Sequence, residues 1–271
     1  MKDKSVQGNV LYRQLSSDEK STLIKNCNQT QNWDSICVSN DFDPDFIHNC
    51  HFFGEIRIGA IKNGFLERFG FSAPAGLYNS TFIDCTIGDF VSINDLHYCA
   101  NYTIGNNVII HNIGELISSD SATFGNGISG TGNKSFIDLV NEIGGRAIIP
   151  FDGIICTDAF LWAKYRENSK LLQRLEEITA ATCSKYKTGA FIGNESVLRN
   201  VKSIRDCKIG ENVLVDCAEI MLNTTIHSDN TERTSIGAGV QLRNAIIGFG
   251  NSIDSGTQLN TVITGCNVSI S

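Results

Sequence analysis

Aliphatic residues return along this chain at a regular interval of 17 residues. Inside each interval they recur in strides of six, six and five residues, which divide it into three short segments. Because a strand needs only a few residues, each stride has room for one short strand and one turn. The interval separates Ile87 and Ile104, Ile192 and Ile209, Ile209 and Ile226, Ile236 and Ile253, and Ile253 and Ile270.

This spacing predicts an all-β solenoid whose coils have three sides. Stacked coils pair their strands in parallel and bury one aliphatic column for each side. A single coil cannot bury such a core, so several coils must stack. A glycine often follows the aliphatic residue, where a turn requires a positive φ or a close approach of neighbours. Examples are Gly59, Gly88, Gly105, Gly193, Gly210 and Gly237.

The repeated segments resemble a known sequence pattern. They read IGDFVSI (87–93), IGNNVII (104–110), IGENVLV (209–215) and IGAGVQL (236–242). This is similar to the hexapeptide repeat of left-handed parallel β-helix proteins, a superfamily dominated by bacterial acyltransferases that act on sugars, nucleotide sugars or amino acids. The resemblance implies a left-handed parallel β-helix. It says little about chemistry, because the repeat residues serve packing.

A closer resemblance extends along most of the chain. The segments YRQLSSDEKSTLIKNC (12–27), GLYNSTFIDCTIGD (76–89) and NEIGGRAIIPFDG (141–153) resemble the amino-terminal half of a bacterial family of large hexapeptide-repeat proteins, a domain of unknown function. That family has a second half with further repeats. Since this chain ends in mid-coil at VSIS, we expect a fragment or an end that another element covers.

The chain outside the repeat predicts an N-terminal cap and one helical insertion. Ser16 and Glu19 form a capping-box pattern for a short helix. The segment 62–75 interrupts the repeat with glycine and proline. We expect an N-terminal cap over 1–45, a first β-helix block with loop excursions over 46–150, an α-helical insertion over 151–190 and a second β-helix block over 191–271.

Residues 158–187 have the three-to-four spacing of an amphipathic helix rather than the repeat. A break near Asn168 leaves open whether one long helix or a pair forms, and Gly189 marks the end. The apolar positions are Leu161, Trp162, Tyr165, Leu172, Leu175 and Ile178.

Composition restricts partners and location. A net charge of −7 without a basic run argues against nucleic acid. No apolar run approaches the roughly 20 residues of a membrane helix, and the N-terminus lacks a signal-peptide core, so we expect a cytoplasmic protein with no membrane partner. Ten cysteines without a C-x-x-C pair predict small buried side chains such as Cys85, Cys99 and Cys217, and no metal site.

Two histidines are candidate catalytic residues. In the hexapeptide acyltransferases that this chain resembles, a histidine acts as general base in a cleft between subunits of a trimer. His111 follows Ile110 and His227 follows Ile226, so both side chains are expected to point outward, as a base facing a cleft must. The alternative is a solvated histidine on a flat face, because no second acid lies beside either one in sequence.

The segment before the helical insertion is a candidate ligand-binding site. Flexible backbone beside an arginine and a carboxylate suits an anionic or sugar ligand. Alternatively, the glycines serve a tight exit from the solenoid while Glu142 and Arg146 pair locally. No phosphate-binding glycine motif occurs. The candidate residues are Asn141, Glu142, Gly144, Gly145, Arg146 and Asp152.

Two functions remain open. The first is a transferase that acts on a small-molecule substrate, with acyl-CoA or a nucleotide sugar as donor, in a homo-oligomer. The second is a non-catalytic β-helix scaffold or binding module. A transferase requires a histidine together with Asn, Asp or Glu around one cleft, and the sequence does not show whether separate coils bring them together.

Overall fold

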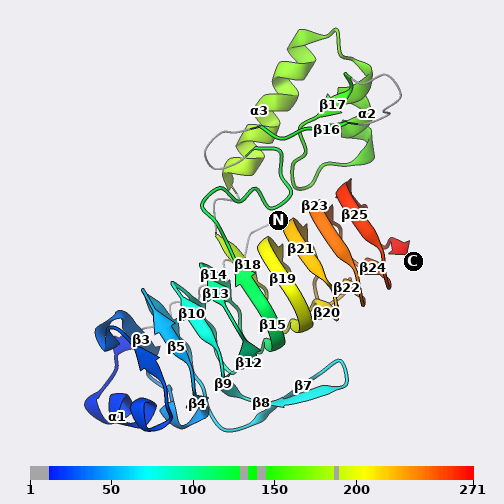
Figure 1. Ribbon diagram of the computed structural model, residues 1–271. Helices are drawn as coiled ribbons and strands as arrows, with labels where there is room; N and C mark the ends of the chain where they lie inside the picture. The colour runs from blue at the N-terminus through cyan, green and yellow to red at the C-terminus, as the bar shows by residue number, and fades with distance from the viewer. Residues whose placement is uncertain (1–11, 129–133, 139–144, 186–188) are drawn as a thin grey trace.

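The computed structural model describes residues 12–128, 134–138, 145–185 and 189–271. Most of the described strands belong to one large sheet that curls around an aliphatic core and forms an elongated stack (Figure 1). Successive steps of the chain pair in parallel, so each step forms one layer of the stack. The structure is therefore mostly β, as predicted. Every layer contributes short strands to three faces, which are named below by what lies on them.

The first face carries the helical segment and is called the excursion face. Its inward column is continuous and fully aliphatic: Val38, Ile58, Ile87, Ile104, Ile192, Ile209, Ile226 and Ile247 pair in order. Its strands are β3 (Ile36–Ser39), β6 (Ile56–Ile58), β11 (Thr86–Ile87), β14 (Tyr102–Ile104), β18 (Ala190–Ile192) and the carboxyl-terminal parts of β19 (Val197–Ile209), β21 (Ile220–Ile226), β23 (Gln241–Ile247) and β25 (Gln258–Ile263).

The second face carries a shallow groove and is called the groove face. Phe52, Phe82, Cys99, Leu116, Ile204, Met221, Leu242 and Leu259 pair in order along its inward column. Its strands are β2 (Gln29–Thr30), β5 (His51–Phe53), β10 (Thr81–Ile83), β13 (Cys99–Ala100), the end of β15 (Ile109–Ile117), the middle of β19 and the beginnings of β21, β23 and β25.

The third face carries a hairpin and is called the hairpin face. Its inward column pairs Ile47, Leu77, Ile93, Ile110, Leu198, Val215, Ile236, Ile253 and Ile270 in order. Its strands are β4 (Ile47–His48), β9 (Gly76–Tyr78), β12 (Ser92–Leu96), the beginnings of β15 and β19, β20 (Leu214–Asp216), β22 (Ser235–Ile236), β24 (Ser252–Ile253) and β26 (Ser269–Ile270).

Asparagine occupies many of the corners between faces. A left-handed backbone is strained for most residues but tolerated by asparagine, which makes it suited to a sharp turn without glycine. Corner amides also bond between layers: Asn112 Nδ2 donates to Asn200 Oδ1 at 2.9 Å and Asn223 Nδ2 to Asn244 Oδ1 at 2.9 Å. Positive φ angles occur at Asn101, Asn107, Asn112, Asn200, Asn212, Asn223 and Asn244.

The amino-terminal segment caps one end of the stack. Helix α1 (Ser17–Lys25) begins with the predicted capping box, in which Glu19 N donates to Ser16 Oγ and Ser16 N donates to the Glu19 carboxylate. Strand β1 (Tyr12–Gln14) pairs antiparallel with β3, and two short 3₁₀ turns follow, η1 (Trp33–Ser35) and η2 (Pro44–Phe46). Parallel pairing already includes β2 and β3, so the stack begins inside the segment expected to be only a cap.

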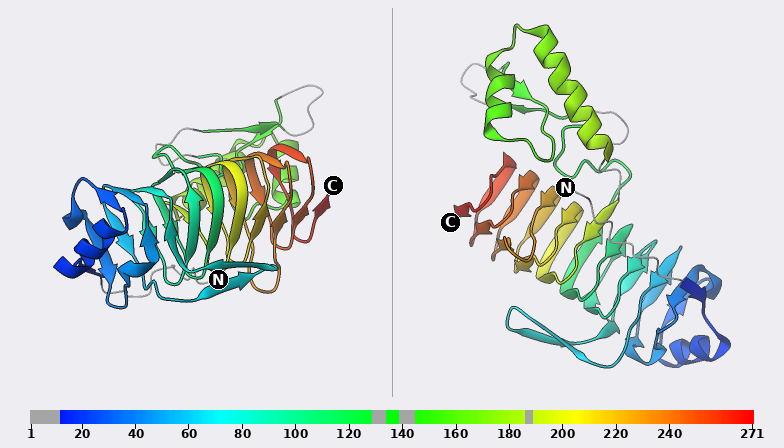
Figure 2. Two further views of the ribbon diagram at one scale, coloured as in Figure 1. Left: turned by 60° about the horizontal axis from the view of Figure 1, so that its bottom comes forward. Right: turned by 180° about the vertical axis from the view of Figure 1, so that it is seen from behind.

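The interruption at 62–75 is an antiparallel hairpin. Its strands, β7 (Phe65–Arg68) and β8 (Phe71–Pro74), leave the stack and extend along the hairpin face toward the later layers (Figure 2). Leu66 and Ala73 pack against Ile109 and Val197, which point outward from that face. The hairpin therefore buries apolar side chains that the stack itself leaves outside.

The helical segment is part of a larger excursion. The stack is left after β15 ends at Ile117 and is resumed at β18, and Ile104 pairs directly with Ile192 across the gap. The excursion thus begins earlier than the predicted boundary at residue 151, and the region around 121–128 contributes no strand to the large sheet. It contains β16 (Ile137–Asp138), β17 (Ala147–Ile148), α2 (Cys156–Lys164) and α3 (Ser169–Lys185).

The excursion has its own small core. Trp162 of α2 and Leu175 of α3 pack with Ile148 and Phe151, and Ile263 of the stack contacts this cluster. The helices form a pair: α2 ends at Lys164 and α3 starts anew at Ser169, after Asn168, whose side chain accepts from Leu171 N at 3.1 Å. In both figures the excursion lies beside the end of the stack that holds β23 and β25 (Figures 1 and 2).

Candidate functional site

His227 lies at the edge of the excursion face, directly after β21. Its backbone N–H donates to Ile247 O at 2.8 Å, which fixes the residue in the ladder. Its ring stacks on Phe249 with 5.0 Å between centroids and 26° between planes. The preceding Ile226 is in the inward column, so the His227 ring points away from the core as expected, and 28% of its side chain is exposed.

Asp152 of the excursion meets this histidine. Its Oδ1 lies 2.5 Å from His227 Nε2, although the two residues are 75 positions apart. Asp152 is only 7% exposed. Its backbone N–H donates to Asn126 Oδ1 at 2.7 Å, so a second part of the excursion holds it in place. The docked excursion thus supplies a nearly buried carboxylate to a partly exposed imidazole.

The pairing determines what the imidazole can do. When Nε2–H of a neutral imidazole donates to a carboxylate, Nδ1 carries the lone pair and can accept a proton. Within the residues that the structure describes, Nδ1 of His227 makes no hydrogen bond. If the ring takes up a proton, the carboxylate stabilises the resulting charge. A buried Asp orients a catalytic histidine in a comparable way, although there the bond is to Nδ1–H and the base is Nε2.

Polar contacts at the strand that precedes His227 also hold the excursion against the stack. Asn223 Oδ1, at the corner before His227, accepts from Thr123 N at 3.2 Å, Thr123 Oγ1 at 2.7 Å and Gly125 N at 3.2 Å. Thr225 Oγ1 donates to Phe124 O at 2.7 Å. Asparagine is common at the corners of this stack and threonine is common in strands, so no sequence signal marks Asn223 or Thr225 as docking residues.

His111 occupies a different environment on the hairpin face. Its ring lies 5.7 Å from that of Phe71 in the hairpin, and its strand neighbour Arg199 places its guanidinium 4.7 Å from the same ring. Arg199 is paired with Asp216 of the next strand. No carboxylate contacts His111 among the described residues, and the structure does not bring His111 and His227 onto one face.

Of the other predicted ligand-binding residues, the two that the structure describes, Gly145 and Arg146, do not join this pair. Asn141, Glu142 and Gly144 lie outside the described residues. Gly145 and Arg146 are exposed, and Gly145 has a φ of +76° with open space beside it, which fits a turn. Among the described members of the predicted cluster, Asp152 is the one that lies at the histidine, where it contacts the imidazole.

The amino-acid sequence was compared with known families and proteins over most of its length. Residues 12–271 match the model of a domain of unknown function, DUF4954. The chain belongs to this family. It is also similar to an uncharacterized protein of Treponema pallidum (strain Nichols), with 37% identity over 245 residues that make up 88% of this chain and 34% of that protein. The chain therefore spans about a third of that relative's length.

The cysteines of this DUF4954 chain are free thiols wherever the structure describes them. Cys85 and Cys99 are buried with their sulfurs 3.5 Å apart, and burial raises the pKa of Cys207 to about 12. Cys217 is exposed, contrary to prediction, because it occupies a corner with a φ of +58°.

Two further properties concern metals and membranes. In the described ranges, no three residues among His, Cys, Asp and Glu lie close enough to hold a metal ion. None of the described helices combines the length and apolarity that crossing a bilayer requires.

Proposed function

We propose that this chain is a left-handed parallel β-helix of the hexapeptide-repeat type and a transferase that acts on a small metabolite, with His227 as general base. The observation that carries the proposal is the contact between His227 and Asp152. Three inward columns of apolar residues in parallel register support the fold assignment. A carboxylate beside an outward histidine is the combination that the sequence alone did not provide.

The proposed reaction is transfer from an activated donor, either acyl-CoA or a nucleotide sugar. For an acyl donor, the acceptor hydroxyl or amine attacks the thioester carbonyl as its proton passes to Nδ1 of His227. Asp152 holds the imidazole in the required tautomer and stabilises the imidazolium. Collapse of the tetrahedral intermediate releases the coenzyme A thiol, which takes up the proton. The stack serves as a rigid support for these groups.

The first experiment measures the thermal midpoint of the protein with each member of a panel of acyl-CoAs and nucleotide sugars. Light scattering gives its oligomeric state. We expect one donor class to stabilise the protein and light scattering to show a homo-oligomer. With that donor, His227→Gln should lower turnover by roughly 10²–10⁴-fold, as for loss of a general base. His97→Gln is the matched control, because His97 is exposed. A protein indifferent to every donor, or a His227→Gln variant with undiminished turnover, would refute the proposal.

A second candidate is a non-catalytic scaffold, and a specific observation favours it. The pair lies within the contact between excursion and stack, where Asn223 and Thr225 also bind. In that case Asp152→Asn would loosen the excursion and affect nothing else. Amide exchange separates the candidates: faster exchange in α2 and α3 of the Asp152→Asn variant, in a protein that no donor stabilises, favours the scaffold.

The excursion surface limits how a scaffold would bind a partner. Trp162 is 3% exposed and belongs to the excursion's own core, so it is not available to a partner. Phe160 and Ile155 are more than half exposed and are available instead. A cytoplasmic location is part of both proposals, supported by the free thiols in the described part of the chain.

A further inference from the structure

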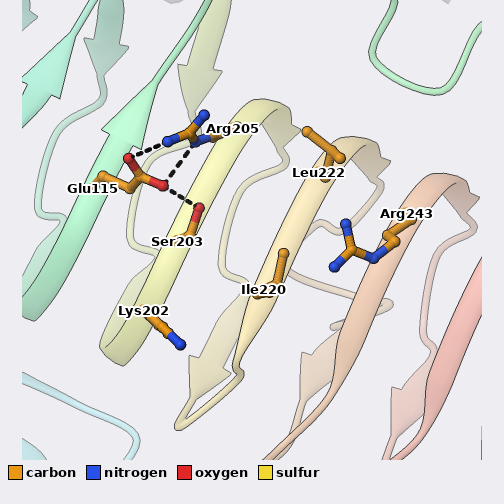
Figure 3. A pocket seen from close by; sticks show the side chains of 7 residues that line it. All are labelled: Glu115, Lys202, Ser203, Arg205, Ile220, Leu222 and Arg243. Atoms are coloured by element: carbon orange, nitrogen blue, oxygen red, sulfur yellow. Dashed lines mark hydrogen bonds and ion pairs between the residues drawn. The ribbon is translucent and has the colours of Figure 1, made fainter.

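The groove face has a polar depression that the proposed transferase reaction does not use. It has a volume of about 370 Å³ and crosses β15, β19, β21 and β23 (Figure 3). Ile220 and Leu222 form its apolar part, while Lys202, Arg205 and Arg243 supply positive charge. The excursion and the hairpin lie on the other two faces, so the groove remains open to solvent.

One carboxylate in the groove is already engaged. Arg205 donates from Nε to Glu115 Oε1 and from Nη2 to Glu115 Oε2, both at 2.7 Å, and Ser203 Oγ donates to Oε1 at 2.6 Å. These hydrogen bonds lower the pKa of Glu115. The paired carboxylate therefore orients the Arg205 guanidinium and has little capacity left to neutralise another cation.

Two cations are left without such a partner. Among the described residues, neither Lys202 nor Arg243 forms an ion pair. The strand neighbours of Arg243 on this face are Leu222 and Asn260, which carry no charge. Three cations face one carboxylate, so the groove is locally positive in a chain whose net charge is −7.

The register brings the arginines within reach of a common ligand. Arg205, Leu222 and Arg243 occupy matching positions on three consecutive strands. Neighbouring strands are about 4.8 Å apart, so the two arginine backbones are roughly 10 Å apart with Leu222 between them. Figure 3 shows the Arg243 side chain extended toward the strand of Ile220 and Leu222. In the same figure the Arg205 guanidinium is turned toward Glu115, so an anion beside Leu222 would meet Arg243 and the edge of Arg205 that Glu115 leaves free.

We propose that this groove binds a small phosphate monoester. The phosphate would lie between Arg243, Lys202 and the free edge of Arg205, since guanidinium forks match phosphate oxygens. The organic part would lie on Ile220 and Leu222. The strands that hold these side chains are fixed in the ladder, so binding requires little reordering of the protein. The site is independent of the His227–Asp152 pair, which lies on another face.

Phenyl phosphate and inorganic phosphate are suitable probes, measured by isothermal titration calorimetry on the intact chain. We expect phenyl phosphate to bind with a Kd of about 1 mM or tighter and inorganic phosphate to bind more weakly, because it lacks the apolar part. The double variant K202Q/R243Q should weaken phenyl phosphate at least about tenfold. Leu222→Asn should weaken phenyl phosphate and leave inorganic phosphate unchanged.

Lys170→Gln is the control, because Lys170 is an exposed cation on α3 far along the chain from the groove. Each variant is first checked for an unchanged thermal midpoint. Absence of phenyl phosphate binding, or equal binding by K202Q/R243Q and by Lys170→Gln, would overturn the proposal. Neither groove substitution touches His227 or Asp152, so this result and the donor panel are read separately.

Discussion

Replacing Tyr102 with Phe is predicted to destabilise the stack at the point where it closes after the excursion. Tyr102 is 1% exposed, and its partner in the next layer is Ala190, whose small side chain leaves room for the ring. The phenol reaches past it to the layer beyond. There it donates to Cys207 O at 2.9 Å and accepts from Cys207 N at 3.0 Å. Burial also raises the pKa of Tyr102 well above its ordinary value.

The magnitude follows from what the missing hydroxyl leaves behind. The N–H of Cys207 loses its acceptor inside the core, which costs roughly 1–3 kcal/mol, and the loss of the second hydrogen bond adds about 1 kcal/mol. The expected destabilisation is therefore about 2–4 kcal/mol. Because the ring of Phe fills the same volume, no cavity term is added.

Urea unfolding monitored by far-UV circular dichroism tests this estimate. With an m-value of about 3 kcal/mol/M, the midpoint should fall by about 1 M. Tyr98→Phe removes the same atom from a side chain that is 42% exposed and serves as the control. Amide exchange should also accelerate at Cys207. Equal midpoints for the two variants would show that the buried hydroxyl contributes nothing, and the reasoning would be refuted.

Two further predictions concern the close approach of layers and a surface ion pair. Gly193→Ala should lower the free energy of unfolding in urea by more than about 3 kcal/mol, because the added Cβ would lie 2.4 Å from the backbone of Gly210. In the control Gly256→Ala, the added Cβ meets nothing within 4 Å, and the expected loss is about 1 kcal/mol for a φ of +75°. Equal losses would refute this. Hydrogen bonds from Arg13 lower the pKa of Glu19 from 4.5 to about 2, so its stabilisation of α1 is complete above pH 4.5 and is lost as the pH falls through about 2. Glu19→Gln should remove that pH dependence from amide exchange in α1, and a persisting dependence would contradict it.

The repeat could be predicted from the sequence because its residues are selected by local and adjacent-layer packing. The sequence did not show which repeat positions belong to the excursion-face column and which to the hairpin-face column. Ile226 pairs with Ile247 rather than with a residue 17 positions on, because the loop 228–233 lengthens that layer. The series that contains Ile236 and Ile253 consequently belongs to the hairpin face, and the series that ends at Ile226 belongs to the excursion face.

The start of the excursion was misplaced for a related reason. SATFGNGISG (121–130) has the small and aliphatic residues of a repeat, and Phe124 does pack against the main core. The backbone of 121–128 nevertheless adds no strand to the large sheet. Composition alone does not distinguish a layer from a loop that lies across layers, since both place apolar side chains on the stack.

The candidate site shows where sequence reasoning ends. His227 and Asp152 were each identified, one from its place after an inward isoleucine and one from its place before the helices. Their contact depends on how the excursion docks, through side chains such as Asn223 whose type is ordinary for a corner. The two residues are 75 positions apart and meet only because the excursion docks on the stack. No regular spacing in the sequence therefore predicts their contact.

The three faces differ because different amounts of non-repeat chain cover them. On the hairpin face, Phe71 covers His111 and Arg199, so outward polar residues there serve to hold the hairpin. On the excursion face, the covering segment brings a carboxylate and completes a pair that the stack alone lacks. On the groove face, Arg243 keeps its charge unpaired among the described residues. The chemistry available to an outward residue of the repeat depends on whether a non-repeat segment covers it. Function is therefore to be sought where the hairpin and the excursion meet the stack, or where they leave it uncovered, rather than in the repeat itself.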